Sequence, residues 1–246
     1  MRNLKLTLAY DGTRLVGWQR QAEGVSVQGL LEDALAEFEG SRVGVHGAGR
    51  TDAGVHALGQ VASVTVTFSH EPSTLRRALN AQLPEEVRVV AIEDVAPDFH
   101  ARFSARSKTY RYRIRNTPIA DPFDRFFAWH VPEPLDVSAM RHAAEAIVGT
   151  HDFVAFQSTG SRTSSTTRTM TRSEWRDTSG VLAYEIAGNG FLRHMVRAVV
   201  GTLVEVGRGW RQPESMAALV EGRSRADAGA TAPAHGLFLV EVDYHL

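Results

Sequence analysis

The chain has 246 residues, a formal net charge of −1 and no cysteine. The missing cysteine excludes disulfides, thiolate metal sites, iron–sulfur clusters and thiol nucleophiles. Hydrophobic residues make up 43% and charged residues 22%, which is typical of globular proteins. No apolar run approaches the roughly 18 residues of a membrane helix, and residues 3–10 alternate as a strand instead of forming a signal-peptide core. We therefore expect a soluble, cytoplasmic protein with one large domain or two smaller ones.

The first half of the chain predicts the element order β-α-β-β-α-β. Apolar spacing predicts strands at residues 3–10, 42–46, 58–68 and 87–95 and helices at residues 27–38 and 74–83. Ser26 is the expected N-cap of the first helix. A glycine-rich loop, residues 47–54, follows the second strand.

The second half predicts the same order. We expect strands at residues 108–115, 170–177, 181–187 and 237–244 and helices at residues 137–148, at residues 191–206 and from Pro213. These elements indicate an α+β fold of two tandem ferredoxin-like β-α-β-β-α-β units. The expected halves are residues 1–100 and 101–246. Linkers are expected at residues 116–134 and in the Ser/Thr-rich tract 158–171.

The glycine-rich loop is the first candidate site. It places Arg50 and Asp52 among three glycines, and glycines allow a backbone to approach a ligand closely. A tight turn that uses Asp as a turn residue is an equally good interpretation of this composition. The chain contains no dinucleotide fingerprint, no phosphate loop and no nucleophile elbow. Asp52 is then the reactive group of the loop, with Arg50 as its natural charge partner.

A second candidate site follows at residues 99–115, which contain six Lys/Arg, four aromatic residues and no acid. Basic residues that neutralise phosphates, together with rings that stack on bases, are typical of single-stranded nucleic-acid binding. In a strand, Tyr110, Tyr112 and Ile114 share one face. The arginines of the other face could instead form a solvated basic surface. Arg102 and Arg106 precede the strand and are stronger RNA-binding candidates.

Arg197 is the third candidate, at the edge of the apolar face of the helix expected at residues 191–206. A cation in that position is expected to have a buried carboxylate partner, or else to extend to the surface as a snorkelling side chain. The histidines show no paired metal-ligand spacing, so a metal is not expected.

These segments together resemble the tRNA pseudouridine synthase A (TruA) family. Residues 49–56 are similar to its catalytic loop, residues 99–105 to its RNA-contacting segment and residues 108–112 to the strand of its active-site tyrosine. Residues 10–12, 17–21, 149–153 and 191–201 are similar to further family signatures.

The resemblance implies a pseudouridine synthase fold with a central RNA-binding cleft. It also implies a homodimer that converts uridine to pseudouridine at positions 38, 39 and 40 in the anticodon stem-loop of tRNA, without a cofactor. By resemblance, Asp52 is the nucleophile, Tyr110 stacks on the target base, Arg197 pairs with Asp52 and Arg50 helps to hold the extruded nucleotide. The implied RNA-binding residues are Phe99, His100, Ala101, Arg102, Phe103 and Arg106.

The chemistry agrees with a chain that has no cofactor motif, because pseudouridine formation only moves the bond of the base from N1 to C5. A carboxylate could attack the sugar, attack the base or remove a ribose proton, and the sequence leaves these three roles open. The alternative function is a non-catalytic RNA-binding protein with ferredoxin-like sheets, which would not need the loop with Arg50 and Asp52. A sugar-cleaving hydrolase would need a second carboxylate beside Asp52, and the sequence offers no candidate for it.

Overall fold

The computed structural model describes residues 1–158, 160, 163–178 and 180–245. The chain forms two compact units: Met1–Arg106 with Phe238–Leu246, and Ser107–Leu237. Thr159, Ser161 and Arg162, which belong to the Ser/Thr-rich tract expected as a linker, lie outside the described residues.

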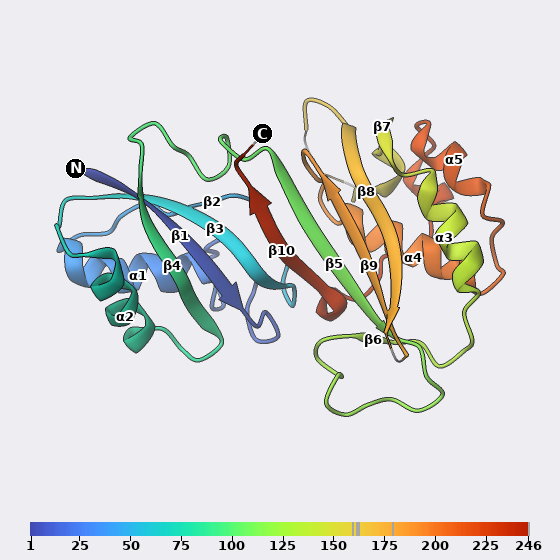
Figure 1. Ribbon diagram of the computed structural model, residues 1–246, viewed down its shortest axis with the longest axis horizontal. Helices are drawn as coiled ribbons and strands as arrows, with labels where there is room; N and C mark the ends of the chain where they lie inside the picture. The colour runs from blue at the N-terminus through green and yellow to red at the C-terminus, as the bar shows by residue number, and fades with distance from the viewer. Residues whose placement is uncertain (159, 161–162, 179, 246) are drawn as a thin grey trace. The chain divides into compact units, whose positions relative to one another are not determined.

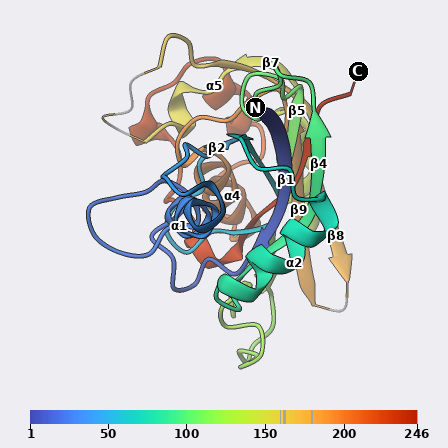
Figure 2. The same cartoon turned by 90° about the vertical axis from the view of Figure 1, so that its left-hand side faces the viewer.

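The first unit is a sheet with two helices on one side (Figure 1, Figure 2). Its strand order is β4 (Val87–Val95), β1 (Arg2–Tyr10), β3 (His56–Val66) and β10 (Leu237–Asp243), with the short β2 (His46–Gly47) also paired to β3. The helices are α1 (Val27–Glu39) and α2 (Pro72–Gln82). Leu4, Leu6 and Leu8 of β1 are fully buried, because alternate residues of a strand face the same side.

Helix α1 begins at the expected N-cap residue, Ser26. The Ser26 hydroxyl accepts a hydrogen bond from the Gly29 N–H (3.2 Å), and the helix ends at Gly40 with φ 71, a left-handed conformation that favours glycine. The strand expected at residues 42–46 is wrong, since only His46 and Gly47 form β2. The Val45 backbone instead exchanges hydrogen bonds with helix side chains, from its N–H to Glu32 (3.4 Å) and from Gln28 to its carbonyl (3.1 Å).

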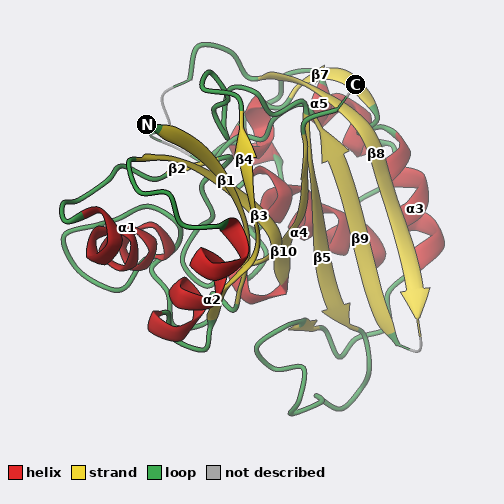
Figure 3. Ribbon diagram, turned by 60° about the vertical axis from the view of Figure 1, so that its left-hand side comes forward, coloured by secondary structure: helices red, strands yellow, loops and turns green. Residues whose placement is uncertain are grey.

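The second unit is an antiparallel sheet with helices behind one face (Figure 3). Its strand order is β5 (Ser107–Arg115), β9 (Val181–Gly188), β8 (Thr167–Thr178) and β7 (Gly149–Asp152), and β6 (Trp129–His130) pairs with β5. The helices are α3 (Val137–Glu145), α4 (Met195–Gly207) and α5 (Ser215–Val220), with short 3-10 turns η1 (Val154–Phe156), η2 (Arg225–Asp227) and η3 (Ala234–Gly236).

Two details of this unit differ from the sequence expectation. The helix expected from residue 191 begins only at Met195, because His194 has φ 62 and a left-handed residue cannot continue a right-handed helix. Strand β7 was not expected. The predicted α+β class is confirmed, whereas the ferredoxin-like description of the units and the boundary at residue 100 stay predictions.

Candidate active site

The glycine-rich loop leads from β2 to β3 and carries Asp52 at the start of a tight turn. The Val55 N–H donates to the Asp52 carbonyl (3.1 Å), and Gly54 between them has φ 77. Such a φ favours glycine, which explains the glycine at this position. The Asp52 side chain is half-buried. The turn and the candidate site are therefore the same structure, not alternatives.

A buried hydrogen-bonded group fixes the loop on both sides of Arg50. The Tyr10 hydroxyl lies 2.8 Å from the Thr51 hydroxyl oxygen and accepts a hydrogen bond from the Gln60 amide (3.3 Å). The Gln60 amide also donates to the Gly49 carbonyl (2.8 Å). Tyr10 is 4% exposed, and burial raises the pKa of its hydroxyl to about 12. We call Tyr10, Thr51, Gln60 and the Gly49 carbonyl the tyrosine clamp.

The backbone of residues 15–18 packs against the loop. The Trp18 N–H donates to the Thr51 carbonyl (3.0 Å), and the Gly54 N–H donates to the Leu15 carbonyl (3.3 Å). Gly17 has φ 102, and a Cβ on it would lie 2.5 Å from the Thr51 carbonyl oxygen. Only glycine permits this approach, so the segment 15–18 fixes the backbone immediately before Asp52.

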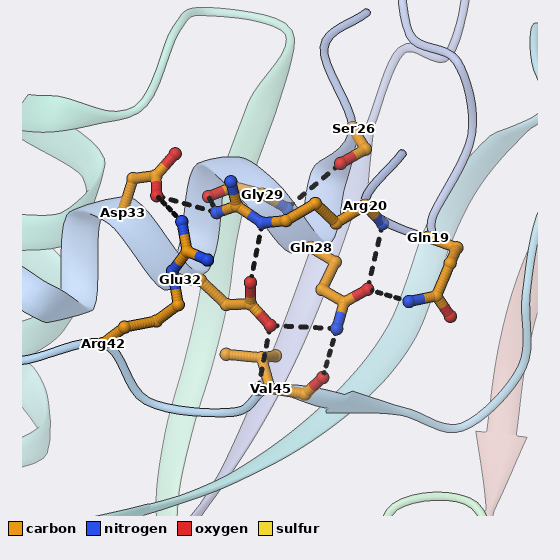
Figure 4. Close-up of polar contacts among 9 residues, drawn as sticks. All are labelled: Gln19, Arg20, Ser26, Gln28, Gly29, Glu32, Asp33, Arg42 and Val45. Atoms are coloured by element: carbon orange, nitrogen blue, oxygen red, sulfur yellow. Dashed lines mark hydrogen bonds and ion pairs between the residues drawn. The ribbon is translucent and has the colours of Figure 1, made fainter. Parts of the chain in front are cut away.

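Helix α1 holds that segment through a polar network (Figure 4). The Gln28 side-chain oxygen Oε1 accepts hydrogen bonds from the Arg20 backbone N–H (3.0 Å) and the Gln19 side-chain amide (2.6 Å). The Arg20 guanidinium donates to the Glu32 carboxylate (2.8 Å) and to Asp33 (2.7 Å). Glu32 is 6% exposed, and a buried carboxylate requires such a partner.

Arg50 is not held as a charge partner of Asp52 in this structure. Its side chain is exposed. Within the described part of the chain, its guanidinium forms no hydrogen bond or ion pair. An exposed cation next to the loop can contact an anionic ligand.

The expected RNA-binding segment divides into anchoring and accessible residues. Ala101 is fully buried, whereas Arg102, Phe103 and Arg106 are exposed. Phe99 and His100 are half-buried, and the Phe99 ring lies 4.9 Å from the Tyr244 ring. The segment therefore offers two arginines and one phenylalanine to a ligand.

Strand β5 shows the predicted alternation. Tyr110, Tyr112 and Ile114 are 7%, 0% and 0% exposed, and the Tyr110 ring packs edge-on against Phe191, with 4.8 Å between the ring centroids and an interplanar angle of 73°. Burial raises the pKa of Tyr112, so this second tyrosine is a neutral core residue.

The arginines on the basic face of β5 have carboxylate partners. The expectation that they bind RNA or form a free solvated surface is therefore corrected. Arg111 donates to Glu185 (2.8 Å), and Arg113 and Arg115 both pair with Asp124. The Glu185 side chain is 6% exposed and also lies near two arginines of β8. These three arginines stabilise the second unit, and neither RNA binding nor a free solvated face is needed to explain them.

Arg197 lies in the first turn of α4 and is half-buried. Its Nε donates to the Ala232 carbonyl (2.7 Å), and its own carbonyl accepts from the Ala232 N–H (3.0 Å). Burial and, secondarily, the Arg197 charge lower the pKa of His235. A guanidinium held in this way is not a snorkelling surface side chain. Its pairing with Asp52 stays a prediction.

The described residues contain no group of three or more His, Asp or Glu side chains placed to hold a metal ion. None of the helices in the described ranges has both the length and the apolar character required to cross a membrane.

The site combines a carboxylate in a rigid loop, exposed cations and aromatic rings in a mixed α+β chain, which fits an enzyme acting on a nucleic acid. Comparison with known proteins agrees. Residues 7–104 and 143–245 match the family model described as tRNA pseudouridine synthase. The tRNA pseudouridine synthase A of Pelobacter propionicus is 44% identical over 99% of this chain and 100% of its own length. Those of Acetivibrio thermocellus and Syntrophotalea carbinolica are 43% and 45% identical over 99% of this chain and 100% and 97% of their own lengths. The chain belongs to the tRNA pseudouridine synthase family.

The sequence interpretation missed the tyrosine clamp. Tyr10 ends an alternating strand, and Gln60 is a polar residue of β3 with 0% exposure. A polar residue at a core position of a strand needs a hydrogen-bond partner, and this is the signal by which Gln60 could have been found.

Proposed function

We propose that this chain isomerises uridine to pseudouridine at positions 38, 39 and 40 in the anticodon stem-loop of tRNA, as a cytoplasmic homodimer and without a cofactor. Its membership of the tRNA pseudouridine synthase family supports the reaction class. The observation that carries the proposal is the loop itself, in which the backbone of residues 15–18 and the tyrosine clamp fix the residues around a half-buried Asp52.

The reaction needs a nucleophile or base but no other reagent. The N1–C1′ bond of the uridine breaks, the freed uracil turns, a C5–C1′ bond forms and the C5 proton leaves as N1 gains one. Asp52 either forms a transient covalent bond to the sugar or the base, or removes a ribose proton. Each role needs an ionised carboxylate in a fixed position.

The remaining residues would hold the nucleotide and the carboxylate. Tyr110 would stack on the extruded base, and stacking on an aromatic ring compensates part of the cost of flipping a base. Arg197 would pair with Asp52 and orient its carboxylate. The exposed Arg50 would contact the extruded nucleotide. In this proposal, the N-terminal half, residues 1–100, supplies the loop, and the C-terminal half, residues 101–246, supplies Tyr110 and Arg197.

The test is to incubate the protein with an unmodified tRNA transcript and to map pseudouridine by position. The wild type should modify positions 38–40, and transcripts with cytidine at those positions should stay unmodified. Asp52→Asn should form no product yet bind tRNA within a few-fold of the wild type, because the amide is nearly isosteric but is a poor nucleophile and base.

The matched control is Asp177→Asn, which makes the same change at an exposed position of β8 and should modify tRNA like the wild type. Substantial turnover by Asp52→Asn would remove its role as nucleophile. A wild type that binds tRNA but leaves every uridine unchanged would favour the non-catalytic RNA-binding protein.

A further inference from the structure

Three rings and a guanidinium gather on the first unit, and one of them, His46, lies outside the expected RNA-binding segment. The ring centroids of His46 and His100 are 5.0 Å apart at an interplanar angle of 30°. Those of His100 and Phe103 are 4.4 Å apart at 38°. The Arg102 guanidinium lies over the Phe103 ring, 5.6 Å from its centroid. We call His46, His100, Arg102 and Phe103 the ring platform.

The backbone that carries the ring platform is fixed by buried contacts. Ala101 is fully buried. Its N–H donates to the Ser63 hydroxyl (3.1 Å), and its carbonyl accepts from the Tyr244 hydroxyl (2.8 Å). His46 is paired with the same Ser63 in the β2–β3 ladder. Because the scaffold is already ordered, binding on the platform costs little conformational entropy.

The platform is open to solvent, and the His100 ring within it carries little charge at neutral pH. Phe103 is 76% exposed, and His46 is exposed as well. Burial, together with the neighbouring charges of His46 and Arg102, lowers the pKa of His100, so its ring is neutral at neutral pH. The result is a cluster of three mutually tilted rings that ends at the exposed Phe103, with one permanent cation beside that ring and no acidic member.

This combination matches an unpaired nucleobase and its phosphate. Bases stack on aromatic side chains without regard to sequence, and an adjacent arginine neutralises the phosphate. A base within a duplex has both faces covered by its neighbours and cannot stack on a protein ring in the same way.

We propose that the ring platform stacks an unpaired base of the tRNA, with Arg102 on the adjoining phosphate and His46 as a further RNA-binding residue. This inference rests on the proposed function in that it takes tRNA as the ligand.

The base on the platform is a different one from the reacting uridine. The platform meets β3 at Ser63, whereas the loop with Asp52 meets β3 at Gln60, through Gly49. Three residues of a strand span about 10 Å. His46 directly precedes the loop, but the point at which Ala101 is held lies about 10 Å along β3 from the point at which Gly49 is held. Loss of the Phe103 ring should therefore act on affinity more than on the chemical step.

The experiment measures the dissociation constant of an unmodified tRNA transcript across a salt titration, alongside single-turnover rates. Phe103→Ala should weaken binding about 5- to 150-fold, His46→Ala should weaken it by a smaller factor, and both should keep the salt slope of the wild type. Phe103→Trp should restore affinity because it restores a stacking face. Arg102→Gln should reduce the slope by about 0.7 to 0.9, the contribution of one phosphate contact.

Matched controls come from two exposed rings outside the platform, Phe123→Ala (87% exposed in the wild type) and His70→Ala, which should bind like the wild type. A fully paired RNA duplex should bind Phe103→Ala and the wild type equally well. Thermal unfolding of each variant should match that of the wild type, since Phe103 packs against little protein.

The results separate this inference from the proposed function. If the wild type forms pseudouridine but Phe103→Ala and His46→Ala bind like the wild type, the ring platform is refuted and the function stands. Equal losses on the duplex, or a salt slope that falls in Phe103→Ala, would also refute stacking. If the wild type binds tRNA without modifying it and the platform variants still lose affinity, the platform stands and the proposed function fails.

Discussion

Replacing Tyr10 with phenylalanine removes a single hydroxyl from the tyrosine clamp and keeps the ring that fills the core. The Thr51 hydroxyl and one N–H of Gln60 then lose their partner, while the hydrogen bond from Gln60 to the Gly49 carbonyl remains possible. We expect the loop to lose the side-chain contact of Thr51 just before Asp52, and to keep both the backbone hydrogen bond from Trp18 to Thr51 and the anchor before Arg50.

The size of the effect follows from burial. A buried polar group left without a partner costs about 1–3 kcal/mol, and the remaining bond of Gln60 places the loss at about 1–2 kcal/mol of unfolding free energy. That corresponds to a decrease of about 2–8 °C in the melting temperature of a protein of this size. Displacing a catalytic group by about 1 Å can cost a hundredfold in rate, so the single-turnover rate of Tyr10→Phe should fall about 10- to 100-fold, with tRNA affinity within a few-fold.

The matched control is Tyr184→Phe in the second unit. Tyr184 is fully buried, and its hydroxyl lies 2.7 Å from the Ser173 hydroxyl, so its stability loss should be similar and its rate close to that of the wild type. Because the pKa of Tyr10 is about 12, its hydroxyl stays protonated between pH 6 and 9, and the rate ratio of wild type to Tyr10→Phe should be constant there. Equal rate losses in both variants, or a ratio that changes with pH, would refute the positioning role.

Five other substitutions test the charged residues and the ring of Tyr110. Arg197→Met should lower the single-turnover rate more than 100-fold. It should lower the unfolding free energy by up to about 3–5 kcal/mol, the range for a buried pair in which one charge is left without its partner. A rate within a few-fold of the wild type would refute the pairing with Asp52. Arg102→Ala and Arg106→Ala should each reduce the slope of log affinity against log salt concentration for tRNA binding by about 0.7 to 0.9. Tyr110→Ala should cut turnover and leave this slope unchanged. Equal slopes in all variants would place the RNA elsewhere. Burial alone would raise the pKa of Glu185, yet the hydrogen bond and charge of Arg111 and the charges of Arg176 and Arg172 lower it overall. A lowered folded pKa means that this carboxylate stabilises the fold above its unfolded pKa of about 4.3 and that the contribution is lost as pH falls below that value. Glu185→Gln should therefore be less stable than the wild type at pH 7 and nearly equal to it at pH 3, as chemical denaturation at the two pH values would show.

The sequence predicted those features that depend on neighbouring residues. The alternation of β5 was correct because side chains of a strand alternate with a period of two, and the N-cap at Ser26 was correct because capping is local. The predicted start of α4 at residue 191 was wrong, because the apolar spacing of the sequence does not reveal that His194 has a left-handed backbone.

Partners distant in sequence were beyond such reasoning. Arg111 finds Glu185 only because β5 and β9 pair in one register, and that register depends on the tertiary fold. The tyrosine clamp joins Tyr10 and Gln60, 50 positions apart, for the same reason. The roles of Asp52, Tyr110 and Arg197 came from family resemblance, and they stay predictions until their variants are measured.

The strand pairing of β10 has a consequence for the order of events during protein synthesis. Phe238 and Leu239 pair with His56 and Ala57 at the start of β3, and the Phe238 ring stacks on the His56 ring with centroids 4.7 Å apart. The segment that follows the glycine-rich loop is thus completed by residues translated some 180 positions later. A nascent chain lacks the partner strand of the start of β3, next to this loop, until β10 has left the ribosome. Partly synthesised chains are therefore expected to lack a properly supported Asp52 while translation is still in progress.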